Sequence, residues 1–230
     1  MYGSKSTELT KILKLFTRFF VRRNVTDTPP TRDLDKLFIE LVDYCHQQDP
    51  TPTVMSIKEF LSKPAWSISD ELFETKLRGN LYTDNTDATR FILCSIEASH
   101  QTNETQTDLW KRYESGQFYW TIEHILPQGK NIPAEWVEMI APGDAKRASE
   151  LQGGYVHQLG NLTISGYNTT LGNLPFDKKR DRKDNKGNFV GYKNNLYLNR
   201  ELAHTESWDV GAIEARSVRL VEECLGLFAL

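Results

Sequence analysis

The sequence has few cysteines, no long apolar run and no excess of positive charge. Its three cysteines, Cys45, Cys94 and Cys224, stand far apart and form no CxxC pair, which argues against a disulfide scaffold and a zinc ribbon. No apolar run approaches the ~20 residues that a membrane span needs. Residues 1–10 also lack the apolar segment of a signal peptide. We therefore expect a protein of the cytoplasm that makes no contact with membranes.

The charge balance does not by itself indicate a nucleic-acid partner. Lys and Arg number 28 against 31 Asp and Glu, so the net charge is −3. Domains dedicated to nucleic acids are often basic overall, so any such binding would depend on local patches. One candidate patch is residues 178–186, where six Lys or Arg accompany two acids. The second is the first predicted helix, with Lys11, Lys14, Arg18, Arg22 and Arg23. The alternative for either patch is a solvated face.

Residues 1–110 have the pattern of a helical region. Apolar residues recur at helical spacing between Leu9 and Phe20, Ser6 or Thr7 could cap that helix, and Pro29-Pro30 would end it. Further helices are predicted at about 33–46, 56–61, 69–78 and 87–98. These apolar stripes are typical of core faces.

Residues 111–230 have a different texture and are predicted to form a second region. Residues 118–122 and 161–164 are aromatic or β-branched and favour two short strands. A helix is predicted at 133–140, and another runs from a cap at 207–209 to about 227. We expect an α+β fold that is mostly helical. A helical N-terminal region would accompany a small β-hairpin finger packed among helices.

Two strings hold the residues suited to catalysis: residues 121–128 (TIEHILPQ) and 157–164 (HQLGNLTI). Hydrolysis of a phosphodiester needs a base for water, and histidine can accept a proton near neutral pH. A hard divalent cation held by carboxylate and amide oxygens would stabilise the charge at phosphorus and the leaving oxygen. Neighbouring strand residues point to opposite faces, so Glu123 and His124 could share a site only at a strand end.

The strings resemble the C-terminal HNH-like (His-Me finger) nuclease module of GmrSD-like, modification-dependent restriction enzymes. The resemblance rests on EHILPQ at 123–128, HxLGNLTI at 157–164, the following Asn168 and Asn173, and PFDKK at 175–179. Weaker matches extend over nearly the whole chain and include FVRR at 20–23, Trp136, Trp208, Ile213 and Arg216.

The resemblance implies a role for each matching residue. His124 becomes the general base, Glu123 a metal ligand, and Asn161 the residue that orients the His-bearing loop. Asn168 becomes the second ligand for Mg²⁺ or Mn²⁺. The gap between Asn161 and Asn168 is shorter than in the usual HNH pattern, which leaves Asn173 as a rival ligand.

Residues that could hold the substrate are less specific. His157 belongs to the second string, and either packing or a phosphate contact would explain it. Lys178, Lys179 and Arg180 suit phosphate neutralisation, although a solvated helix start is the alternative. Gly160-Asn161 could equally be a turn.

The function implied is that of a metal-dependent DNA endonuclease or nickase, in a type IV-like restriction system against phage. Relatives have a nucleotide-binding module that recognises modified DNA and contains a DGQQR-like string, which this sequence lacks. We therefore expect such a module upstream in the same protein or on a separate subunit. Alternatives are a non-catalytic DNA- or protein-binding module with a degenerate finger, and an RNase with the same finger. A zinc protease is not indicated, because there is no HExxH string.

Overall fold

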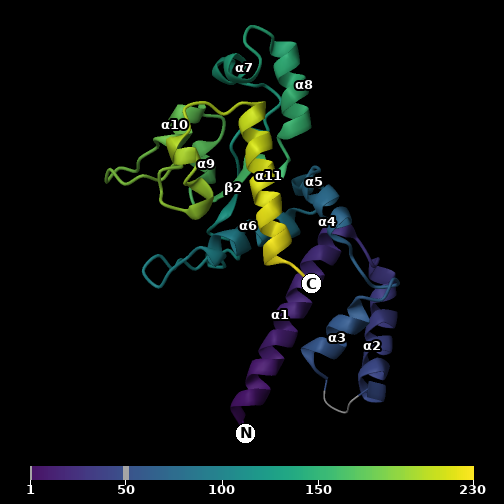
Figure 1. The fold of residues 1–230 in the computed structure, drawn as a ribbon. Coiled ribbons are helices and arrows are strands. Elements are labelled where there is room, and N and C mark those ends of the chain that lie inside the picture. Colours follow the sequence, from purple (N-terminus) through teal and green to yellow (C-terminus); the bar gives the residue numbers. More distant parts are fainter. Residues whose placement is uncertain (1, 49–51) are drawn as a thin grey trace. The chain divides into compact units, whose positions relative to one another are not determined.

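A computed structural model describes residues 2–48 and 52–230 of the chain (Figure 1). The chain forms two compact units, one made of Met1–Leu77 with Cys224–Leu230 and the other of Arg78–Glu223. The division predicted at residue 110 therefore lies inside the second unit. None of the helices in the described ranges is long and apolar enough to cross a membrane.

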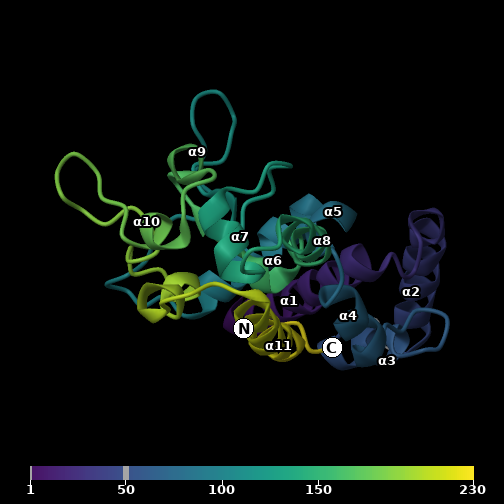
Figure 2. The same ribbon diagram turned by 90° about the horizontal axis from the view of Figure 1, so that it is seen from above.

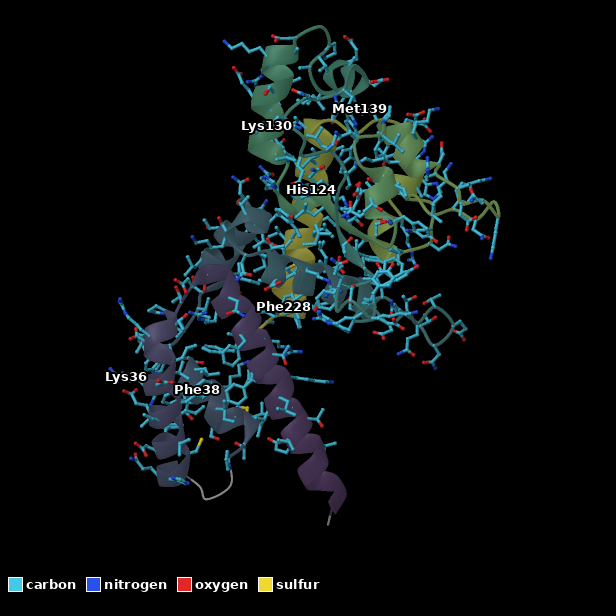
Figure 3. All side chains as sticks on the ribbon, turned by 180° about the vertical axis from the view of Figure 1, so that it is seen from behind. Lys36, Phe38, His124, Lys130, Met139 and Phe228 are labelled. Atoms are coloured by element: carbon cyan, nitrogen blue, oxygen red, sulfur yellow. The ribbon has the colours of Figure 1, made fainter. Side chains whose placement is uncertain are left out.

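The first unit is helical, because its apolar residues recur at the spacing of one helix face. Its helices are α1 (Tyr2–Thr26), the short 3-10 helix η1 (Thr31–Asp33), α2 (Leu34–Gln48), α3 (Val54–Leu61) and α4 (Asp70–Leu77). The first helix begins before the predicted cap and ends before Pro29-Pro30 as predicted. Phe38 of α2 packs on Phe16, while Lys36 on the same helix is exposed (Figure 3).

Two arginines of α1 that the sequence offered as part of a basic patch are internal. Arg22 donates hydrogen bonds to the carbonyl oxygens of Phe228 and Ile68 and pairs with Asp70. Arg23 is bound to Pro29 O and to its neighbours in the turn that follows α1. Both side chains are buried, so the prediction that they face DNA is wrong: their charges serve backbone carbonyls of the first unit.

The second unit is built around a two-stranded antiparallel sheet. The strands are β1 (Thr121–His124) and β2 (Leu162–Ser165), with Glu123 opposite Thr163 and His124 opposite Leu162. The first strand starts three residues later than the sequence predicted, because residues 118–120 belong to the loop before it. Together with the helices, this sheet confirms the predicted α+β, mostly helical fold.

Short helices surround the sheet of the second unit. Before β1 lie α5 (Leu81–Asp84) and α6 (Thr86–Ser99); between the strands lie α7 (Ala134–Ile140), α8 (Ala145–Tyr155) and η2 (Leu159–Asn161); after β2 come α9 (Asn168–Leu171), α10 (Phe176–Arg180), η3 (Tyr197–Asn199), η4 (Leu202–His204) and α11 (Val210–Leu227). The helix α8, which the sequence did not indicate, is capped by Asp144, whose side chain accepts from Arg147 N at 2.8 Å. Trp136, Phe176 and Trp208 lie in the core that these helices enclose.

Candidate active site

The two strings of the sequence meet in one ββα arrangement. The first ends β1, the second contains η2 and begins β2, and α9 follows β2 and packs against β1. Figure 3 marks His124 within the second unit. Strand pairing thus brings together residues that lie more than thirty positions apart in the sequence.

Asn161 fixes the loop that follows His124. Its Nδ2 donates to the carbonyl oxygens of Leu126 and Val156, both at 3.0 Å, and its Oδ1 accepts from Leu126 N at 2.8 Å. The indole of Trp208 donates to the same oxygen at 3.1 Å. The side chain is fully buried, and every polar atom of its amide group is used. Its geometry is that of a residue that holds the His-bearing loop, which is the place the sequence assigned to it.

His124 lies in a cluster of three rings. Its Nε2 is 3.2 Å from Nδ1 of His157, within hydrogen-bond distance. The ring of Tyr82 meets His124 edge-on, with centroids 4.6 Å apart, and stacks parallel on His157 at 5.3 Å. The bond to His157 occupies Nε2 and leaves Nδ1 as the ring nitrogen that a water molecule could use. His157 is therefore placed as a partner of the candidate base.

The surroundings of His124 keep its imidazole neutral. The side chain is 6% exposed, and burial is the main cause that lowers its pKa to about 3. The nearby His157 and Lys179 act in the same direction, because a second positive charge beside them is unfavourable. A neutral imidazole can accept a proton at physiological pH, which is what a general base must do.

Glu123 points away from His124, toward the interior. Its Oε1 accepts from Lys179 Nζ at 2.7 Å and from the hydroxyl of Tyr192 at 3.4 Å. Lys179 Nζ also donates to His124 O at 2.7 Å and to Ile125 O at 3.1 Å. Burial raises the pKa of Glu123 and lowers that of Lys179, while the attraction between the two charges opposes both shifts. Lys179 is thus an internal cation beneath the His-bearing loop.

The predicted metal ligands do not converge with the candidate base. Asn168 donates through Nδ2 to Ile122 O at 2.6 Å and to Thr121 Oγ1 at 3.3 Å. Thr121 and Glu123 alternate with Ile122 and His124 along β1, so Asn168 lies beside the Glu123 face. Asn173, the rival ligand, is exposed and lies against Gly129. Within residues 2–48 and 52–230, no group of three or more His, Cys, Asp or Glu side chains could hold a metal ion.

This donor set does not fit a divalent ion as it stands. A metal at Glu123 would need the carboxylate oxygen that Lys179 holds, and both side chains are buried: Lys179 is 0% and Glu123 2% exposed. The expectation that Glu123 and His124 share a site at the strand end is not met either, because both still belong to β1 and face opposite ways.

The predicted phosphate contacts divide into an internal residue and paired surface residues. Lys179 cannot touch a phosphate from its buried position, so its assignment to the substrate is corrected: burial next to Glu123 explains it. Arg180 is bound to Asp181 and Glu206, and Lys178 to Asp177. The charge of residues 178–180 is therefore largely engaged within the protein.

Sequence reasoning missed two neighbours of the site. Tyr82 stacks on His157 from the short helix α5, and no spacing in the sequence linked it to the two strings. Arg216 of α11 donates to the carbonyl oxygens of Gly160 and Leu162 at 2.6 and 2.7 Å. That arginine had appeared only as a weak match near the C-terminus, although a charged residue in an apolar stripe is itself a signal of an internal partner.

A family model confirms the resemblance. Residues 66–223, which are most of the chain, match the C-terminal domain of the GmrSD restriction endonucleases. The chain belongs to this family. The matched segment of the GmrSD domain nearly coincides with the second unit, residues 78–223, and contains the whole ββα arrangement. No match was found among curated proteins.

Proposed function

We propose that the chain is an HNH-type DNA endonuclease or nickase that hydrolyses phosphodiester bonds with His124 as the general base. The observation that supports this best is the neutral imidazole at the end of β1, with Nε2 bound to His157 and Nδ1 available to water. The chain's membership in a restriction-endonuclease family supports DNA as the substrate.

In this proposal each residue of the site has a distinct task. His124 takes the proton from the attacking water. His157 holds the imidazole through Nε2, and Asn161 holds the following loop through Leu126. Lys179 binds the carbonyl oxygens of His124 and Ile125 and thereby fixes the backbone at the base.

A requirement for Mg²⁺ or Mn²⁺ is part of the proposal, although Glu123 as arranged is not a free ligand. When bound, such an ion would supply positive charge to the phosphate and to the leaving oxygen. The part played by a recognition module for modified phage DNA, on the same protein or on a partner, is likewise proposed from the family.

The test is cleavage of supercoiled plasmid, scored as nicked and linear DNA. We expect cleavage with Mg²⁺ or Mn²⁺, none with a chelator, and a loss of ~10²–10⁴ in rate for His124→Ala. His204→Ala, at an exposed histidine of the same unit, is the matched control and should cut like the parent. A His124→Ala variant that is folded and cuts at the parent's rate would remove the base from the proposal.

A second candidate is a DNA-binding module that does not cut. It is favoured by one observation, the occupation of Glu123 by a buried lysine. Under this reading the parent binds DNA and leaves the plasmid intact with either metal. Cleavage of RNA but not of DNA would instead indicate an RNase.

A further inference from the structure

Two long loops of the second unit take no part in the ββα arrangement. Residues 111–119 and 183–189 each form a hairpin closed by a single bridge, Arg112 with Phe118 and Lys183 with Phe189. The first loop is drawn in teal and the second in green; both project from the unit, with the first near α9 and the second near α10 (Figures 1 and 2).

The exposed aromatic side chains of the described residues gather in this region. They are Trp110 at 47%, Tyr113 at 50%, Tyr167 at 38% and Phe189 at 41% exposure. Exposed aromatic rings are costly unless something covers them, and a group of them marks an interaction site. Every one lies in the two loops, next to them, or directly before α9.

The cations of these loops differ from those of α10. Among the residues that the structure describes, Lys111, Arg112, Arg182 and Lys183 form no ion pair within 4 Å, whereas Lys178 and Arg180 do. Two of the unpaired cations lie over rings: Lys183 Nζ is 4.5 Å from the centroid of Phe189, and Arg112 Cζ is 3.6 Å from that of Phe118. Free positive charge and exposed rings are therefore interleaved.

Tyr119 anchors this surface to the finger. Its ring lies so close to Gly166 that a Cβ there would be 2.7 Å from Tyr119 Cε1, and Tyr113 packs on it with centroids 5.3 Å apart. The pKa of Tyr167 is raised, mainly by Tyr119 and further by Asp184 and Tyr113, which places the second loop in the same neighbourhood. Tyr167 in turn directly precedes Asn168, the first residue of α9.

We propose that Tyr113, Tyr167, Phe189, Lys111, Arg112 and Lys183, the aromatic–cation surface, bind an unpaired stretch of DNA beside the scissile phosphate. This rests on the proposed function. Rings stack on bases only where the bases are unstacked from a duplex, and the cations bind the phosphates between them. β1 separates Thr121 from His124 by about 10 Å, or roughly three base steps, since a strand rises ~3.3 Å per residue and DNA ~3.4 Å per step.

Binding of fluorescent oligothymidylate to the full chain, measured by anisotropy in chelator, tests the stacking. Tyr113→Ala/Tyr167→Ala should weaken binding of the single strand between about fivefold and a hundredfold for each ring that stacks. Tyr113→Phe/Tyr167→Phe keeps both rings and should bind like the parent. Binding of a duplex of the same length should change less than twofold.

The salt dependence tests the cations. Lys111→Ala/Lys183→Ala should reduce the slope of log affinity against log salt by about 1.4 on single strands, since each phosphate contact contributes ~0.7. Lys146→Ala, an exposed lysine of α8 in the same unit, should leave the slope unchanged.

The outcomes separate this inference from the proposed function. A parent that binds single strands through the tyrosines but cuts no DNA contradicts the nuclease and leaves the surface standing. The surface is overturned if the parent binds no single strand, prefers RNA, or keeps its affinity in the folded Tyr→Ala variant. Circular dichroism checks the fold; if the double variant unfolds, the single Tyr113→Ala, at the most exposed ring, decides.

Discussion

At the scale of single residues, the site depends on two ionisable groups that burial keeps away from their ordinary states. His124 is neutral because its buried ring cannot easily take a charge, and Lys179 is retained inside because Glu123 and two carbonyl oxygens bind it. Both effects come from desolvation, so both should be measurable as changes in stability.

The titration of His124 predicts how the stability depends on pH. The unfolded chain binds a proton near pH 6.5, whereas the folded protein does so only near pH 3. The stability that comes from a neutral His124 is therefore present above pH 6.5 and is lost as the pH falls toward 3, with a slope of at most about 1.4 kcal/mol per pH unit. His124→Leu cannot titrate, so its free energy of unfolding should fall less steeply between pH 7 and pH 5.

Urea unfolding at several pH values measures this difference. His204→Leu serves as the control, because that histidine is exposed and its loss should leave the pH dependence of the parent in place. Parallel curves for the parent and His124→Leu would mean that His124 titrates normally in the folded protein.

The buried ion pair predicts an asymmetry between single and double variants. Lys179→Met leaves Glu123 buried without a partner and should lower the free energy of unfolding by about 3–5 kcal/mol. Glu123→Gln/Lys179→Met removes both charges and should recover most of that loss. Lys178→Met, at the exposed neighbour, should change stability by no more than about 0.5 kcal/mol. Equal stability of Lys179→Met and the parent would show that Lys179 is not buried in solution.

At the scale of elements, the position of η2 against α11 determines where Asn161 lies. Gly160 meets the backbone of α11 so closely that a Cβ would overlap Ile213 O and the side chain of Ser217. Arg216 and Ser217 also bind the backbone of Gly160, through its O and N respectively. The glycine is needed for close approach, since any side chain would push η2 and the attached Asn161 away from the helix.

Gly160→Ala should therefore destabilise the protein by about 1–3 kcal/mol and slow cleavage. The matched control is Gly153→Ala in α8, where a Cβ would have open space. That variant should be neutral or more stable by up to ~1 kcal/mol, because alanine favours helices. Thermal unfolding of both variants measures the contrast, and a tolerant Gly160 would mean that the approach to α11 is looser than it appears.

At the scale of the whole molecule, a net charge of −3 gives DNA no long-range attraction, so affinity has to arise locally. The first unit also has positive charge: Lys11, Lys14, Arg18 and Lys58 line a groove of about 340 Å³ that ends at Leu230. Most of that unit lies outside the segment that matches the family.

We expect this groove to take no part in DNA binding. Lys14→Ala/Lys58→Ala should leave the salt dependence of duplex binding unchanged. If those lysines contact phosphates, the slope would fall by about 0.9 for each residue. The comparison with Lys111→Ala/Lys183→Ala on the same DNA locates the binding surface on one unit or the other.

The sequence by itself determined the features that neighbouring residues control. Helical spacing located most of the helices, α1 ended before its prolines, and the two strings indicated a family that the comparison confirmed. The place of Asn161 beside the His-bearing loop also followed from the motif, because strand pairing brings the two strings together.

Only the tertiary structure decided which charges are free. Nothing local marks Lys179 as buried and Lys183 as exposed, since each stands in the same basic stretch. Lys179 is internal because Glu123, 56 positions away, accepts its charge, and His124 is neutral because Tyr82 and His157 cover it. Desolvation depends on what packs around a group in space, and a one-dimensional pattern does not contain that information.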